Sequence, residues 1–101
     1  MAMKGLKAES KVANSLRRAG ASVTQSPGSR GSADLVADFG SKIWFTQVKS
    51  SNSGKPAGLS SREEKNLIAR AENNNGTAVL AQVTRGEIKY ISVKSDKELK
   101  P

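Results

Sequence analysis

Two residue types are absent from this 101-residue chain, which contains neither cysteine nor histidine. Their absence excludes disulfide bonds, thiolate chemistry, Ser-His-Asp catalysis and any ordinary zinc site. The side chains left for chemistry are carboxylates, amides, hydroxyls and lysines. The oxygen atoms among them suit hard ions such as Mg²⁺ or Mn²⁺. The lack of cysteine also fits a cytoplasmic protein.

Aromatic side chains and long apolar runs are scarce as well. One tryptophan, one tyrosine and two phenylalanines offer little for stacking on unpaired bases. No apolar run is long enough for a membrane span, and no signal sequence is recognisable. Basic residues, by contrast, are in excess, with a net charge of +8 and a pI near 10.1. This excess favours an anionic partner, nucleic acid ahead of a membrane, although charge alone does not prove one.

The order of helical and strand patterns predicts one α/β domain over residues 1–94 and a charged, flexible tail over residues 95–101. A helix is expected over residues 4–19, and a second from a capping box at Ser60 or Ser61 to the Asn73–Gly76 stop. Strands are expected over residues 21–25, 33–39, 42–49, 77–83 and 87–93. The strand–helix–strand passage between the third and fourth strands favours a right-handed crossover and a parallel pair. We therefore expect a mixed five-stranded sheet flanked by two helices.

A short hairpin carries the most informative polar residues. Asp34 stands where a Gly/Ser-rich loop turns into an apolar strand, and Gln47 and Lys49 flank Val48 on the next strand. Because side chains alternate across a strand, Gln47 and Lys49 project from one face. If the two strands pair, the three polar groups could converge and hold a divalent metal ion beside a phosphodiester. Taken singly, a turn aspartate and a strand-end lysine are the simpler interpretations.

Glu9 lies on the buried side of the first helix, because Val12, Ala13 and Leu16 follow it at helical spacing. An unpaired buried charge is costly, so this carboxylate needs a partner. On helix geometry alone, a salt bridge to Lys11 or another basic group, or a rim position in water, accounts for it.

The loop of residues 26–32 consists of small and polar residues together with Arg30. Its hydroxyls and backbone N–H groups can bind phosphate, and Arg30 adds positive charge. The loop lacks the Gly-Lys-Ser/Thr ending of a P-loop, so it is a weak indication of a phosphate site. Most such stretches are exposed loops.

Taken together, these residues resemble the PD-(D/E)XK nuclease superfamily, and most closely the archaeal-type Holliday junction resolvases. The resemblance covers about the first half of the chain and is carried by Gly5, Glu9, Ser26–Ser29, Asp34 with the following Leu-Val-Ala, and Gln47–Lys49. It implies a restriction-endonuclease-like core with the element order αβββαββ, and cleavage of branched DNA with Mg²⁺ or Mn²⁺.

The resemblance also implies a role for each matching residue. Asp34 would be the principal metal ligand, joined by the amide oxygen of Gln47 and the backbone carbonyl of Val48. Glu9 would bind metal-bound water or a second metal, and Lys49 would position or activate the attacking water. A serine of the loop, Ser29, would lie near the scissile phosphate. The residues expected to contact the DNA backbone are Lys4, Lys7, Lys11, Ser26, Ser29, Arg30 and Ser32.

Gln47 departs from the family pattern, which usually has a glutamate here. An amide oxygen is a weaker ligand than a carboxylate, so metal affinity should fall. Gln25 departs as well, since an arginine usually precedes the serine loop. The C-terminal part is shorter than in typical resolvases, which bears on the familiar dimer interface.

Four hypotheses follow. The leading one is a metal-dependent Holliday junction resolvase that acts as a homodimer, because symmetric cuts suit a two-fold axis; the resemblance suggests an archaeal or viral host. The others are a less selective restriction- or repair-type duplex nuclease, a non-catalytic branched-DNA-binding protein, and a basic RNA-associated domain. The last leaves Glu9, Asp34 and Lys49 unexplained.

Overall fold

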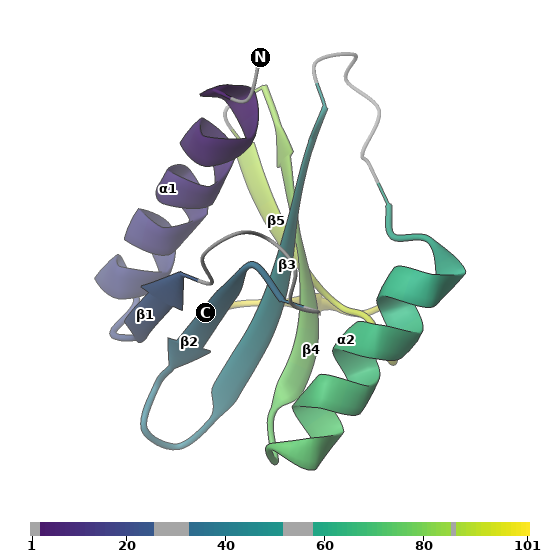
Figure 1. Cartoon of the computed structure of the whole chain (residues 1–101). Helices are drawn as coiled ribbons and strands as arrows, with labels where there is room; N and C mark the ends of the chain where they lie inside the picture. Colours follow the sequence, from purple (N-terminus) through teal and green to yellow (C-terminus); the bar gives the residue numbers. More distant parts are fainter. Residues whose placement is uncertain (1–2, 26–32, 52–57, 86) are drawn as a thin grey trace.

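A single mixed sheet forms the middle layer of the molecule, with α1 and α2 on its opposite faces (Figure 1). The computed structural model describes residues 3–25, 33–51, 58–85 and 87–101. The elements follow in the order α1 (Met3–Arg18), β1 (Ser22–Gln25), β2 (Leu35–Asp38), β3 (Ile43–Ser51), α2 (Ser61–Asn73), β4 (Thr77–Thr84), β5 (Glu87–Ser92) and β6 (Glu98–Leu99). The strands lie side by side in chain order, and among them only β3 and β4 pair in parallel. The α/β class, the mixed sheet and the parallel pair joined through α2 are thus confirmed.

The β2–β3 hairpin has the pairing that the sequence predicts. Its strands are antiparallel, with Asp38 opposite Ile43. The turn is closed by a hydrogen bond from the Phe39 N–H to the Lys42 carbonyl at 2.9 Å, and Gly40 has a φ of 90°. A residue with a Cβ atom would be strained at that φ angle. The Asp38 carboxylate accepts the Gly40 N–H at 2.8 Å and so stabilises the turn.

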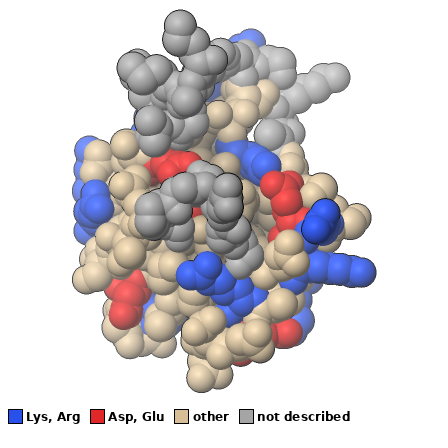
Figure 2. Space-filling model, viewed as in Figure 1, with Lys and Arg blue, Asp and Glu red and all other residues tan. Residues whose placement is uncertain are grey.

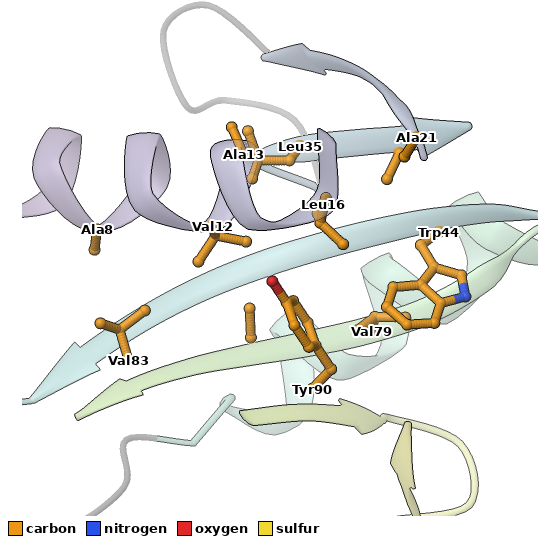
Figure 3. Packing of buried hydrophobic residues seen from close by; sticks show 12 residues of the cluster. Ala8, Val12, Ala13, Leu16, Ala21, Leu35, Trp44, Val79, Val83 and Tyr90 are labelled. Atoms are coloured by element: carbon orange, nitrogen blue, oxygen red, sulfur yellow. The ribbon is translucent and has the colours of Figure 1, made fainter. Parts of the chain in front are cut away.

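Two hydrophobic cores, one under each helix, hold the layers together. On β3 the alternation is direct, since Trp44 packs under α1 and Phe45 under α2. Figure 3 shows α1 laying its apolar stripe on the sheet, with the Tyr90 hydroxyl pointing toward the helix. The α1-side core contains Ala8, Val12, Ala13, Leu16, Ala21, Leu35, Ala37, Trp44, Val79, Ala81, Val83 and Tyr90. The α2-side core contains Ala33, Phe45, Leu67, Ala71 and Ala78.

The end of the chain differs from the sequence prediction. Residues 95–101 were expected to form a charged tail, but Glu98–Leu99 forms a sixth strand that pairs with β5, with Leu99 opposite Tyr90. Leu99 is the apolar residue of this stretch and packs, partly buried, against the α1-side core. The predicted count of five strands is therefore one too low, because a single apolar residue among charged ones gives no periodic signal.

Thr46 provides a test of stability in the middle of β3. Its side chain is fully buried, and its hydroxyl has no hydrogen-bond partner within the described part of the chain. A buried hydroxyl that has lost its water costs about 1–3 kcal/mol. We expect Thr46→Val to raise the free energy of unfolding by about 1 kcal/mol in a urea titration. Thr24→Val, at an exposed position of β1, is the control and should change it by less than about 0.5 kcal/mol. A loss of stability in Thr46→Val would mean that the hydroxyl is bonded.

Candidate nuclease site

Asp34 lies at an irregularity where β2 begins. The register pairs Leu35 with Thr46, yet the Asp34 N–H also donates to the Thr46 carbonyl, at 2.9 Å. Asp34 and Leu35 therefore both lie opposite Thr46 of the neighbouring strand, which is the pattern of a β-bulge. Packing agrees, because Ala33 lies in the α2-side core and Leu35 in the α1-side core, whereas regular alternation would place both on one face. The bulge thus redirects the chain at Asp34.

The Asp34 carboxylate is tied to the backbone of β3. It is 7% exposed, and its Oδ2 accepts the Val48 N–H at 2.9 Å. Leu35 and Thr46 form the last regular pair of the hairpin, so this bond lies just beyond it. The N–H and C=O of one strand residue point to the same side. The Val48 carbonyl therefore also points toward the Asp34 side of β3 and away from β4.

Glu9 is close enough to Asp34 for the charges of the two carboxylates to interact. It lies on α1 and is half-buried. Burial of the carboxylate, and second the negative charge of Asp34, raise the pKa of Glu9 above its ordinary value. No ion pair among the described residues includes Glu9, so a salt bridge to Lys11 does not form there. Two carboxylates thus repel one another across the gap between helix and sheet, an arrangement that a bound cation would stabilise.

Gln47 and Lys49 are both half-buried, at alternate positions of β3. Because Ile43 and Phe45 pack under α2, the alternation directs Gln47 and Lys49 toward the α2 face. The ammonium of Lys49 donates to Glu63 Oε2 at 2.8 Å. The structure therefore brings Glu9 and Asp34 together and ties Asp34 to the backbone between Gln47 and Lys49, while the Lys49 ammonium contacts α2.

Glu63 is the residue of this site that the sequence did not indicate. The sequence offers two capping boxes, Ser60 with Glu63 or Ser61 with Glu64, and the first is present. Glu63 accepts the Ser60 N–H at 3.0 Å and donates its own N–H to the Ser60 hydroxyl at 3.2 Å. The contact with Lys49 depends on how α2 packs on β3, and no local sequence pattern encodes it. The sequence shows a carboxylate at a helix start, and only the fold places it beside the half-buried Lys49.

The predicted DNA-binding residues are only partly placed. Lys11 is exposed on α1, whereas Ser26, Ser29, Arg30 and Ser32 lie outside the described residues. Lys4 and Lys7 belong to α1, but their side chains are not among those described. Basic and acidic side chains adjoin one another on the face seen in Figure 2, so this face is not uniformly positive.

A scan against protein families matches residues 1–99 to the archaeal Holliday junction resolvase (Hjc) family. The chain belongs to this family. It is therefore a structure-selective nuclease that resolves branched DNA, as the sequence predicts. The match spans nearly the whole chain, including the second half, where the sequence resembles the family only in element order.

A solved structure agrees with the family assignment. Hjc from Archaeoglobus fulgidus, a Holliday junction resolvase from an archaeal hyperthermophile, superposes with a TM-score of 0.81 at 25% identity, over 90% of this chain and 74% of that one. A search of curated proteins gave no match. None of the described helices of this Hjc-family chain is long and apolar enough to cross a membrane.

Proposed function

We propose that this chain is a metal-dependent endonuclease that hydrolyses phosphodiester bonds in four-way DNA junctions with Mg²⁺ or Mn²⁺. The observation that carries the proposal is the bond that ties the buried Asp34 carboxylate to the strand that holds Gln47 and Lys49, with Glu9 near enough for the charge of Asp34 to raise its pKa. Such a pair of adjacent, partly desolvated carboxylates is unfavourable for folding, which is typical of functional sites.

The donor set fits a hard divalent ion. Glu9, Asp34, the amide oxygen of Gln47 and the carbonyl of Val48 supply oxygen ligands only, which suit Mg²⁺ or Mn²⁺. Among residues 3–25, 33–51, 58–85 and 87–101, no three acidic, histidine or cysteine residues gather. Gln47 stands where the family pattern usually has a third carboxylate. When bound, the ion stabilises negative charge on the phosphate and favours ionisation of the attacking water.

The protein's own residues hold and orient the reacting groups. The Val48 N–H holds the Asp34 carboxylate against β3, and the β-bulge turns the chain at this residue. The Lys49 ammonium is a positive charge near the point where negative charge develops on the phosphate, and it orients the water. To Ser29, which matches the serine of the family's loop, we assign a contact with the phosphate next to the scissile bond.

Recognition of the junction depends on charge and shape. We assign contacts with the phosphate backbone to the α1 edge and the following loop, through Lys4, Lys7, Lys11, Ser26, Ser29, Arg30 and Ser32. Binding of this kind weakens steeply with salt. Symmetric cutting of two strands calls for two copies of the site, so we infer a homodimer, which sedimentation of the protein with and without junction would test.

The direct experiment compares a labelled four-way junction with linear duplex of the same sequence, with EDTA, Mg²⁺ or Mn²⁺. We expect paired, symmetric cuts in the junction only, and only with metal. The melting temperature without DNA should rise with Mn²⁺ concentration, because an ion that binds only the folded state stabilises it. Binding without cleavage under all conditions would instead indicate a degenerate site that recognises branched DNA.

Gln47→Glu tests the departure from the family pattern. Restoring a carboxylate adds a full charge at ligand distance, and we expect the Mg²⁺ concentration for half-maximal cleavage to fall by about tenfold, or about 1.4 kcal/mol. Asn66→Asp is the control, since it makes the same chemical change at an exposed position of α2 and should have no effect. An unchanged metal requirement in Gln47→Glu would exclude residue 47 from the ligand set.

A further inference from the structure

The Lys49–Glu63 contact joins the catalytic strand to the start of α2. The ammonium and carboxylate are 2.8 Å apart, and the two side chains are 29% and 37% exposed. An ion pair in bulk solvent contributes little, but this one is partly shielded and lies at the end of a packed helix. It therefore holds the Lys49 ammonium at the start of α2. Without this contact the ammonium would move with its flexible four-carbon stem.

Glu63 is itself held from two sides. Its Oε1 accepts the Ser60 N–H while its Oε2 accepts Lys49, so each oxygen has its own donor. The hydrogen bond from Lys49, followed by the one from the Ser60 backbone, lowers the pKa of Glu63 below its ordinary value. The carboxylate is therefore ionised at neutral pH and is oriented before any substrate arrives.

We propose that Glu63 is a positioning residue for cleavage, acting through Lys49, and that the capping box of α2 is the rigid mount that holds it. This inference rests on the proposed catalytic role of Lys49. A lysine that orients a water must be held within a fraction of an ångström, and a partner that preorganises it raises the rate without contacting the substrate. The helix start thus serves two purposes, capping α2 and fixing the ammonium.

Glu63→Gln separates the two purposes. Glutamine at this position can still accept the Ser60 N–H and so keeps the capping box, but it loses the charge that holds Lys49. We expect the single-turnover rate of junction cleavage at saturating protein to fall by roughly tenfold or more. The dissociation constant for the junction should stay within about twofold, because Glu63 lies behind Lys49 rather than on the DNA.

One matched control and two further variants test the cause of the rate loss. Glu64→Gln makes the same change at the next residue of α2, which is exposed, and should leave the rate within about twofold. Ser60→Ala removes the hydroxyl that caps α2 but keeps the Glu63 carboxylate. It should lower the melting temperature, and it should slow cleavage by the folded protein less than Glu63→Gln does, because the Ser60 N–H still holds the carboxylate. Glu63→Asp keeps the charge but shortens the side chain, and should also slow cleavage.

Lys49→Met decides whether Glu63 acts through the lysine. In that background Glu63→Gln should have no further effect on the residual rate, since the group that it positions is gone. An equal rate loss in both backgrounds would overturn the proposal, and so would a wild-type or faster rate in Glu63→Gln, the latter meaning that Glu63 restrains Lys49. If Lys49→Met itself cuts normally, the proposed role of Lys49 fails first.

Discussion

Asp34→Asn is expected to lower the rate of junction cleavage by about 10³-fold or more while leaving the protein folded. Asparagine keeps an oxygen that can accept the Val48 N–H, so the bulge and hairpin remain intact. The substitution removes the charge of the proposed principal metal ligand. Several kcal/mol of transition-state stabilisation convert to this factor at 1.36 kcal/mol per tenfold. Single-turnover cleavage with Mg²⁺ measures the loss.

Asp34→Asn should not weaken binding of the DNA junction. Removing a carboxylate from a site that faces phosphates reduces repulsion, so the junction should bind equally well or more tightly without metal. The rise in melting temperature with Mn²⁺ should disappear, because the ion no longer has its main ligand. A variant that still cleaves within tenfold of the wild type would remove Asp34 from the catalytic centre.

The pKa of Glu9 provides a second test of the Asp34→Asn substitution. The charge of Asp34 contributes to the raised pKa of Glu9, so this pKa should fall in Asp34→Asn and remain only as high as burial makes it. An NMR titration of the Glu9 carboxyl carbon measures the change. Asp38→Asn is the matched control, because Asp38 lies at the far end of β2 and bonds the hairpin turn. It should change neither the rate nor the pKa of Glu9.

The architecture could be predicted largely from local signals. The helix stop at Gly20 is an example, since its φ is 105° and the Ala21 N–H returns to the Leu16 carbonyl at 3.1 Å. This is the Schellman arrangement that a glycine after an apolar stripe predicts. A capping box at Ser60 or Ser61 was also predicted, and the structure has it at Ser60. Both features depend on residues within one or two turns of each other, which is the range over which sequence patterns are informative.

The site was less predictable, because its geometry depends on an irregularity and on contacts distant in sequence. Strict alternation would have put Ala33 and Leu35 on one face, and the bulge that separates them has no signature in this polar-to-apolar boundary. Asp34 and Glu9 approach each other only because α1 packs over β2 and β3. Glu63 could be predicted only as one of two possible capping residues, whereas its contact with Lys49 joins residues 14 positions apart.

Gly76 shows the same distinction between a correct prediction and its physical reason. The sequence predicts a helix stop at Asn73–Gly76, and α2 does end there. The left-handed residue, however, is Asn75, with a φ of 56°, and the Gly76 N–H closes the end by donating to the Ala71 carbonyl at 2.7 Å. A glycine is needed at position 76 because neighbouring atoms leave no space for a side chain. A Cβ at this position would lie 2.5 Å from the Phe45 ring and 2.9 Å from the Ile43 carbonyl oxygen.

Gly76→Ala is therefore expected to destabilise the protein by about 3 kcal/mol, at the upper end of the usual cost of overpacking. The Phe45 ring is buried and cannot swing into solvent, and the Ile43 carbonyl is backbone. The steric clash therefore weakens the packing of α2 against β3. Urea unfolding followed by circular dichroism would measure it.

The control and the rescue together identify the steric cause. Gly58→Ala adds a methyl group where no atom lies within 4 Å, and should change the free energy of unfolding by less than about 0.5 kcal/mol. In a Phe45→Leu background, where part of the ring is absent, the cost of Gly76→Ala should shrink by roughly half, as expected for residues in direct contact. Additive losses would attribute the effect to backbone conformation. Because α2 also carries Glu63, a steric loss would show that the close approach at Gly76 sets the position of the helix that contacts Lys49.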